Sequence, residues 1–336
     1  MKRHFIRKSA PSAVPNLLLG ASSYLRQHGG MRAGRLFIGM LAGNAAGGLA
    51  CLLAAGLNRL GHGDEWFLKI AYPSLLLIPF AMGLVAAWVW RPLELRIGQA
   101  LLHSLSCTVL GLGAAFLVFR EGAVCLVIVS PILYAGTVAG ALTGRAWFRK
   151  SNDRLNLCLA PLFLFAVAAE PSLRGTHVGV ATDEIRIAAP PSKVWPHVLA
   201  FPAIPDAPGY WLFRVGLPYP VETTNGGNFI GADRACRFSG GAVFKEKVAE
   251  LMPEKLLTFD IVEMPPDPEL LGHLTAQRGQ FELRDNGDGT TTLIGRTWYS
   301  LEVRPAAYFD WWTHDIFRVV HLRVMKHIQR LAESGN

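Results

Sequence analysis

The sequence has little charge for its length. Of its 336 residues only 17% are Asp, Glu, Lys or Arg, whereas 51% are apolar or aromatic. A soluble domain usually carries about 25% charged residues. This shortage of charge argues against a purely soluble enzyme and against disorder.

Standard catalytic signatures are also lacking. The chain has no G-x-S-x-G, H-E-x-x-H or C-x-x-C motif and no glycine-rich phosphate loop. Of its five cysteines, Cys236 stands alone in the C-terminal half, so no disulfide can form within that half. The sequence therefore predicts no metal site and no cofactor, and it leaves any catalytic residue unassigned.

Long uncharged runs hold the apolar excess of the N-terminal half. A membrane-spanning helix needs roughly 17–25 such residues. Four runs meet this length: Leu36–Leu57, Ile70–Trp90, Ile97–Phe119 and Gly122–Leu142. A fifth, Leu155–Ala169, is shorter and spans only if the bilayer thins or the run extends toward Leu173. We predict an all-α transmembrane bundle of about five spans over residues 36–173.

The charge is unevenly distributed. The net charge of +8 divides into +11 for residues 1–174 and −3 for residues 175–336. A basic chain is typical of nucleic-acid binding, but here the basic residues flank the apolar runs, so we exclude nucleic acid as a partner. The tail (residues 1–35) and the second and fourth connections between the runs hold 13 Lys and Arg. The first and third connections and the residues after the fifth run, on the other side of the membrane, hold 4. The positive-inside rule then places the basic tail in the cytoplasm, at a plasma or inner membrane.

The side of the C-terminal half depends on the fifth run. If Leu155–Ala169 spans, residues 174–336 lie on the non-cytoplasmic side, which is our prediction. If that run lies in the membrane interface instead, the same residues stay cytoplasmic.

Glycines recur every four positions in two of the spans: Gly39, Gly43 and Gly47 in the first, and Gly136, Gly140 and Gly144 in the fourth. Such spacing lets helix backbones approach closely. We interpret both stripes as packing within one bundle, and a homo-oligomer face is the alternative.

From Thr176 the pattern changes to short alternating segments separated by turns. Helices are expected at 193–200 and from Pro305 to Ala332. Strands are expected at Val178–Ile187, Trp211–Val215, Asn228–Phe238, Ala242–Leu251, Leu256–Met264, Gly279–Asp285 and Thr290–Glu302. This order predicts an α+β domain over residues 174–336, in which an antiparallel sheet surrounds one long C-terminal helix.

One segment of this half carries a resemblance to a known family. The segment Glu184–Val198 contains Ile-Arg-Ile-Ala-Ala-Pro-Pro-Ser-Lys-Val-Trp and resembles the opening of the START-like superfamily known as SRPBCC. The resemblance continues through Phe244–Met252, Leu256–Phe259, the Gly-Asp-Gly-Thr-Thr-Thr turn at 287–292 and the terminal helix. It implies a helix-grip fold of the lipid-transport and polyketide cyclase/dehydrase type, with a cavity for an apolar ligand. The terminal segment, from Arg296-Thr297-Trp298-Tyr299 through His321-Leu322-Arg323-Val324, is similar to a subgroup of multipass membrane proteins with this domain.

Strand alternation predicts which side chains face that cavity. The pocket candidates are Trp195, Arg237, Phe244, Glu246, Phe259, Phe281, Thr297, Tyr299, Trp312 and His314. Arg237 is expected to join Glu246 across the hairpin turn, either inside the pocket or as an ordinary cross-strand pair. The loop from Pro265 to Gln277 is expected to close the cavity mouth or to touch the membrane, with ordinary packing as the alternative.

These features favour membrane-tethered binding of a hydrophobic small molecule or lipid, for presentation, transfer or sensing. The expected partners are the lipid bilayer and that apolar ligand. One alternative is a cyclase/dehydratase-type enzyme with Glu246 or His314 as acid/base. Another is a structural or interaction module whose cavity is filled by its own side chains.

Overall fold

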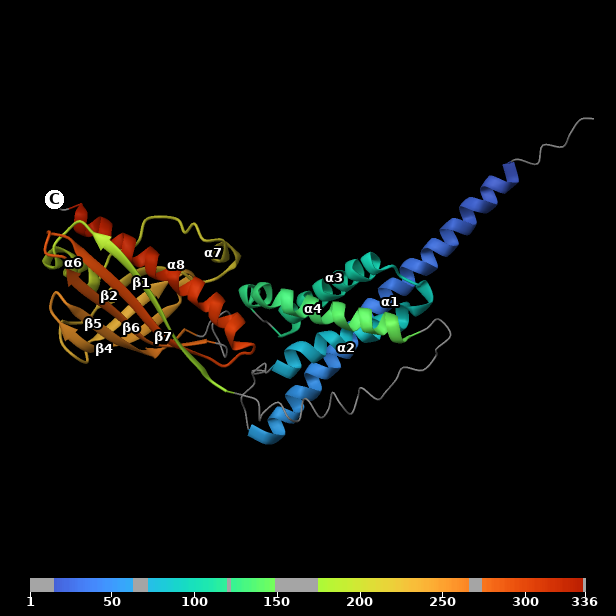
Figure 1. Ribbon diagram of the computed structural model, residues 1–336, viewed down its shortest axis with the longest axis horizontal. Helices are drawn as coiled ribbons and strands as arrows, with labels where there is room; N and C mark the ends of the chain where they lie inside the picture. The colour runs from blue at the N-terminus through green and yellow to red at the C-terminus, as the bar shows by residue number, and fades with distance from the viewer. Residues whose placement is uncertain (1–14, 63–71, 120–121, 149–174, 266–273, 335–336) are drawn as a thin grey trace, which may run out of the picture.

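The computed structural model describes residues 15–62, 72–119, 122–148, 175–265 and 274–334. It consists of an N-terminal group of helices, here called the bundle, and a C-terminal β-rich part, here called the grip domain (Figure 1). The predicted fifth run Leu155–Ala169 lies outside the described residues, as does most of the predicted loop from Pro265 to Gln277.

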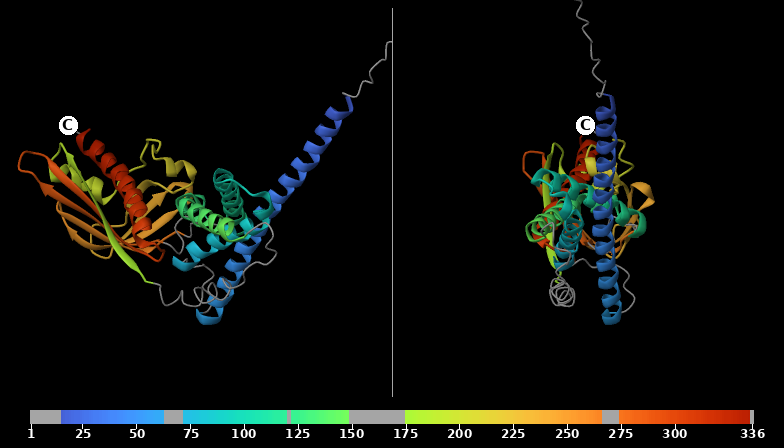
Figure 2. Two further views of the ribbon diagram at one scale, coloured as in Figure 1. Left: turned by 45° about the vertical axis from the view of Figure 1, so that its right-hand side comes forward. Right: turned by 90° about the vertical axis from the view of Figure 1, so that its right-hand side faces the viewer.

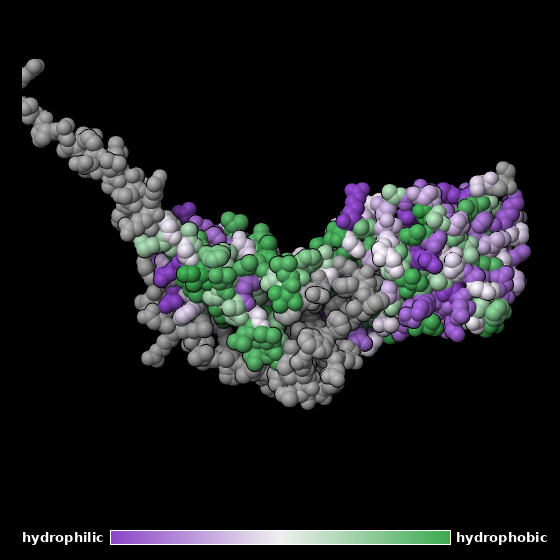
Figure 3. Space-filling model, turned by 180° about the vertical axis from the view of Figure 1, so that it is seen from behind, coloured by the Kyte–Doolittle hydropathy of each residue, from purple (hydrophilic) through white to green (hydrophobic). Residues whose placement is uncertain are grey.

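The bundle contains long apolar helices. Its elements are α1 (Pro15–His62), α2 (Tyr72–Trp90), the short helix η1 (Arg91–Leu93), α3 (Ile97–Ala114), the π-helical turn η2 (Ala115–Phe119) and α4 (Ala123–Trp147). Four stretches are long and apolar enough to cross a membrane: Gly30–Leu53, Leu75–Leu93, Ile97–Val118 and Ala123–Trp147. Apolar residues dominate the visible surface of this part, whereas the grip domain is largely polar outside (Figure 3).

Both glycine stripes pack against α2 of the same chain. A Cβ at Gly43 would lie 2.6 Å from the carbonyl oxygen of Met82, and one at Gly140 would collide with the carbonyl oxygen of Phe80. The remaining four glycines of the two stripes meet other residues of α2 in the same way. A contact between copies through these glycines would therefore require α2 to leave them.

The grip domain is a seven-stranded antiparallel sheet closed over by one long helix (Figure 2). Its strands are β1 (His177–Ile187), β2 (Pro220–Asn225), β3 (Asp233–Phe238), β4 (Val243–Met252), β5 (Leu256–Glu263), β6 (Leu274–Asp285) and β7 (Thr291–Leu301). Its helices are α6 (Pro191–Leu199), α7 (Trp211–Val215), the single turn η4 (Ser239–Gly241) and α8 (Ala306–Glu333). The strands lie in the order β1-β7-β6-β5-β4-β3-β2, and the curled sheet forms a half-barrel that fits a helix-grip fold.

The core of the grip domain lies between the sheet and the C-terminal half of α8. Met325 and Ile328 of α8 are fully buried, and they belong to the same cluster as Leu257 of β5 and Leu293 of β7. The expected long helix ending near Ala332 thus agrees with the structure. Its apolar residues recur at spacings of three and four, which puts them on one face toward the sheet.

Two local predictions are wrong. Trp211–Val215 is the helix α7, because the consecutive residues Leu212 and Phe213 are both buried and a strand points consecutive side chains to opposite faces. The expected strand Asn228–Phe238 begins only at Asp233, and the strand β2 before it was not expected. A turn separates the two strands, with Gly231 at φ +91°, a value that glycine adopts at little cost.

The glycine packing predicts a selective effect of an added methyl group. Gly140→Ala forces α2 and α4 apart and should lower the free energy of unfolding by about 1–3 kcal/mol, the usual range for overpacking. In Gly34→Ala the new methyl group meets no atom within 4 Å. That control should be neutral or stabilise by up to about 1 kcal/mol, since alanine favours helix. Thermal unfolding of the full chain in detergent micelles measures both, and equal melting temperatures for the two variants would contradict the packing.

Candidate functional site

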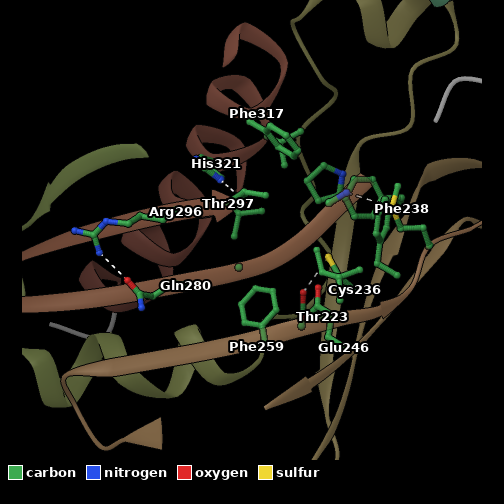
Figure 4. A pocket seen from close by; sticks show the side chains of 18 of the residues that line it. Thr223, Cys236, Phe238, Glu246, Phe259, Gln280, Arg296, Thr297, Phe317 and His321 are labelled. Carbon is green, nitrogen blue, oxygen red and sulfur yellow. Dashed lines mark hydrogen bonds between the residues drawn. The ribbon is translucent and has the colours of Figure 1, made fainter. Parts of the chain in front are cut away.

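A cavity of about 130 Å³, here called the grip cavity, lies between the sheet and α8 (Figure 4). Aromatic side chains make much of its lining: Phe201, Phe238, Phe244, Phe259, Phe281 and Phe317. An apolar cavity of roughly 150 Å³ stays dry and takes up benzene. The grip cavity therefore has room for an aromatic ring or a short piece of hydrocarbon chain.

A buried ion pair lies in the lining of the grip cavity. Glu246 of β4 is opposite Arg234 of β3 in the strand register, and Arg234 Nη1 donates to Glu246 Oε2 at 2.6 Å. The two side chains are only 5% and 2% exposed. The guanidinium also donates to the carbonyl oxygens of Val198 and Leu199 at 3.4 Å, and it lies 4.3 Å from the centre of the Phe259 ring. Arg234 thus ties β3 to β4 and to the end of α6.

The surroundings of Glu246 limit its use as an acid or base. Burial raises the pKa of the Glu246 carboxyl, and the adjacent Arg234 charge opposes that rise. A Glu246 carboxyl that carried a proton for transfer to a ligand would be neutral and would no longer balance the Arg234 charge, so the ion pair would be lost. Breaking a buried pair is strongly unfavourable, so the geometry favours a structural role for Glu246.

Cys236 lines the grip cavity beside this pair. The hydroxyl of Thr223 donates to the sulfur at 3.4 Å. Burial, together with the nearby Glu246 charge, raises the pKa of the Cys236 thiol to about 12. The thiolate is the nucleophilic form, so at neutral pH this side chain behaves as a small apolar group.

His321 of α8 connects two strands through hydrogen bonds. Its Nδ1 lies 2.8 Å from Asp183 Oδ2 of β1, and its Nε2 lies 2.8 Å from Thr297 Oγ1 of β7 (Figure 4). An ionised carboxylate only accepts hydrogen bonds, so Nδ1 donates to Asp183. When the ring is neutral, Nε2 then accepts from the threonine hydroxyl. His321 and Thr297 both line the grip cavity. This carboxylate–imidazole–hydroxyl chain is the arrangement in the cavity best suited to proton transfer.

A second polar cluster surrounds Asp310, near the start of α8. Tyr299 is fully buried and its hydroxyl donates to Asp310 Oδ1 at 2.6 Å, while His177 Nε2 lies 2.9 Å from the same oxygen. Burial raises the pKa of Tyr299, and the Asp310 carboxylate raises it further. Burial also acts to raise the pKa of Asp310, but the hydrogen bonds from Tyr299 and His177 hold it below its ordinary value. Within the described ranges, no three or more His, Cys, Asp or Glu side chains form a group suited to a metal ion.

The predicted pocket residues divide between several places. Those that line the grip cavity are Phe244, Glu246, Phe259, Phe281 and Thr297. Trp195 packs at the edge of the hydrophobic core. Tyr299 and the half-exposed His314 belong to the Asp310 cluster, with His314 Nε2 3.8 Å from Asp310 Oδ2. Trp312 lines a second cavity, between the grip domain and the bundle.

The predicted contact between Arg237 and Glu246 is wrong. The Arg237 side chain is 59% exposed, and its Nε lies 3.4 Å from Glu222 Oε1. Because side chains alternate along a strand, Arg234 and Cys236 face the cavity while Arg237 faces away. The partner of Glu246 is therefore found three residues earlier in the chain.

Sequence reasoning missed several residues of the cavity. Strand alternation counted from the true start of β3 would have selected Arg234 and Cys236. His321 lies four residues after Phe317 and is buried, so the helical period contained a signal for it. Asp183 is 138 residues from His321, and nothing in the local sequence connects the two.

The similarity found between this chain and known proteins is a similarity of fold to solved structures. No protein-family model matches the chain, and no curated protein sequence matches it. Norcoclaurine synthase from Thalictrum flavum, solved in complex with dopamine and hydroxybenzaldehyde, is 16% identical, with a TM-score of 0.34, over 48% of this chain and 90% of that chain. The Zhui aromatase/cyclase from Streptomyces sp. R1128 is 14% identical, with a TM-score of 0.33, over 47% of this chain and 94% of that chain.

Protein MLL2253 from Mesorhizobium loti is 15% identical, with a TM-score of 0.32, over 47% of this chain and 99% of that chain. All three structures have SRPBCC-type folds and align with the C-terminal half. At these identities and scores, the fold class of the grip domain rests on its own strand order and on the position of α8.

The buried ion pair predicts a large difference between a single and a double substitution. Arg234→Met leaves Glu246 buried without its partner and should lower the free energy of unfolding by about 3–5 kcal/mol. The double variant Arg234→Met/Glu246→Leu replaces the pair by apolar groups and should recover most of that loss. Near-UV circular dichroism of the full chain during heating measures both. A single variant as stable as the wild type would contradict the prediction.

The Tyr299–Asp310 contact predicts a pH-dependent contribution to stability. Tyr299→Phe removes a hydrogen bond to a charged group, which should cost about 1.5–3 kcal/mol near neutral pH. Since the pKa of Tyr299 is raised in the folded state, this contribution is complete below the unfolded value of about 10 and declines as pH rises beyond it. The lowered pKa of Asp310 makes the contribution decline again as pH falls below about 4.

Melting temperatures of the wild type and Tyr299→Phe across this pH range test the contact. The two curves should run parallel from about pH 5 to 9 and converge at more alkaline pH. A difference in melting temperature that stays constant up to about pH 11 would contradict the raised pKa of Tyr299 and its hydrogen bond to Asp310.

Proposed function

We propose that the protein binds a hydrophobic small molecule in the grip cavity while the bundle holds it in a membrane. The observation that carries this proposal is the character of the cavity, which is aromatic and has its polar side chains already paired. Arg234 pairs with Glu246, and Thr297 with His321. A ligand there is held by apolar contact and shape, as in most small-molecule pockets.

The long apolar helices support membrane attachment. Four described stretches have the length and composition of membrane spans. Attachment raises the local concentration of the binding site next to the bilayer, where a poorly soluble ligand accumulates. Presentation, transfer and sensing all benefit from this arrangement.

The packing between the two parts supports the predicted orientation. Val124 and Ile128, in the first turns of α4, pack in one cluster with Leu212 of α7. The helix α4 has 25 residues and ends at Trp147, so at 1.5 Å per residue it is about 37 Å long. The chain therefore leaves α4 far from the grip domain. A further span at Leu155–Ala169 would bring it back, with the grip domain on the side opposite the cytoplasmic tail.

Two variants of neighbouring residues test binding. Cys236→Phe fills the grip cavity, whereas Arg237→Phe adds the same ring on the opposite face of β3. Native mass spectrometry and solvent extraction of the full chain from lipid nanodiscs should show an apolar ligand on the wild type and on Arg237→Phe. Cys236→Phe should reduce its occupancy at least tenfold. Val324→Phe, which fills the same cavity from α8, covers the case in which Cys236→Phe fails to fold.

A ligand-free wild type, or equal occupancy in the filled and control variants, would contradict binding in the grip cavity. Those results would favour the structural or interaction module. A cavity of about 130 Å³ already makes that alternative less favourable, because its own side chains do not fill it.

A cyclase/dehydratase-type enzyme is the second candidate, and the His321 chain is the observation that favours it. This chain replaces Glu246, which is held by Arg234, and His314, which lies outside the grip cavity. His321→Gln keeps hydrogen-bonding capacity but cannot act as a base. If the protein is an enzyme that removes water from its substrate, the species extracted from His321→Gln should be heavier than that of the wild type by one water, because unreacted substrate accumulates. Identical species in both would leave binding as the function.

A further inference from the structure

A second cavity lies between the bundle and the grip domain, and we call it the bundle cavity. Its volume is about 320 Å³. Residues from α1, α2, α3 and α4 line one side of it, and residues from β6, β7 and α8 line the other. It therefore joins the membrane-spanning helices to the domain that holds the grip cavity.

The two cavities adjoin at the same two side chains. Leu274, the first residue of β6, and Ile316 of α8 line both the grip cavity and the bundle cavity. Both side chains are only partly buried. A chain that passes from one cavity to the other would have to displace these two apolar side chains.

Specific contacts hold the bundle and the grip domain together beside the bundle cavity. The hydroxyl of Tyr308 in α8 donates to the carbonyl oxygen of Ile128 in α4 at 2.6 Å. Val124 and Ile128 of α4 share a hydrophobic cluster with Leu212 and Phe213 of α7. The junction at Leu274 and Ile316 is thus part of a packed interface.

The lining of the bundle cavity suits a hydrocarbon chain that ends in an acyl carbonyl. Its polar side chains from the helices bond to backbone carbonyls, such as Asn44 to Cys107 at 3.1 Å and Thr137 to Leu133 at 2.8 Å. The buried indole Nε1 of Trp312, which also lines the cavity, has no hydrogen-bond partner among the described residues. A buried donor without a partner is unfavourable, and an ester or carboxyl oxygen of a ligand would satisfy it.

We propose that the bundle cavity binds the acyl chain of a membrane lipid and that the chain enters the grip cavity past Leu274 and Ile316. This inference rests on the proposed function, and it adds the source of the ligand and its route. The two cavities together provide about 450 Å³, within the usual range of roughly 300–1,000 Å³ for ligand pockets, which the grip cavity does not reach alone. An apolar chain on this route passes from bilayer to pocket without crossing water.

Photolabelling of the full chain in nanodiscs tests the route. The probe is a phosphatidylcholine with a diazirine at the end of one acyl chain, and mass spectrometry locates the labelled peptides. In the wild type we expect label in both cavities. Ile316→Trp should keep the label in the bundle cavity and reduce that in the grip cavity at least fivefold. Arg318→Trp, exposed on the same helix, should behave like the wild type, and Leu274→Trp repeats the block from the other side of the junction.

A second probe separates the route from the proposed function. A short diazirine-bearing fatty acid, added from water, should label the grip cavity of the wild type without help from the bundle. If neither probe labels the grip cavity, the proposed function fails. If the short acid labels it but the lipid probe labels neither cavity, or if Ile316→Trp and Leu274→Trp leave the lipid labelling of the grip cavity unchanged, the route alone is overturned.

Discussion

The packing of α8 against two different partners determines the shape of the grip domain. Its C-terminal half is buried on the sheet through Val324, Met325 and Ile328. Its N-terminal half packs through Trp312 and Ile316 against α7 and the first turns of α4, while Phe309 and Phe317 of the same half pack on β1 and β7. The grip cavity lies along the middle of α8, where residues from Ile316 to Val324 line it.

The polar side chains of the grip cavity stabilise the fold through bonds to neighbouring strands and to α8. The pair Arg234–Glu246 ties two strands together, and His321 ties β1 and β7 to the helix through Asp183 and Thr297. These bonds join the strands and the helix that form the walls of the cavity. A preformed apolar space reduces the ordering that a ligand has to impose on binding.

The sequence predicts the repetitive parts of this structure well and the contacts between distant segments poorly. Strand alternation and helical period identified the long helix, most strands and the inward direction of Phe244 and Phe281. The helix α7 was missed because five residues are too few to show a period. Arg237 was chosen in place of Arg234 because an unrecognised turn hid the start of β3, and no local pattern joins Asp183 to His321.

The environment of Cys236 has a consequence for the compartment in which the grip domain can reside. Disulfide formation and exchange proceed through the thiolate, and burial raises the pKa of this thiol to about 12, so it is protonated at neutral pH. It lies against Thr223 in the cavity lining, away from the outer face of the sheet. A lone cysteine on a surface would cross-link copies of the protein under oxidising conditions. Held in this way, Cys236 makes the grip domain equally compatible with a reducing cytosol and an oxidising exterior.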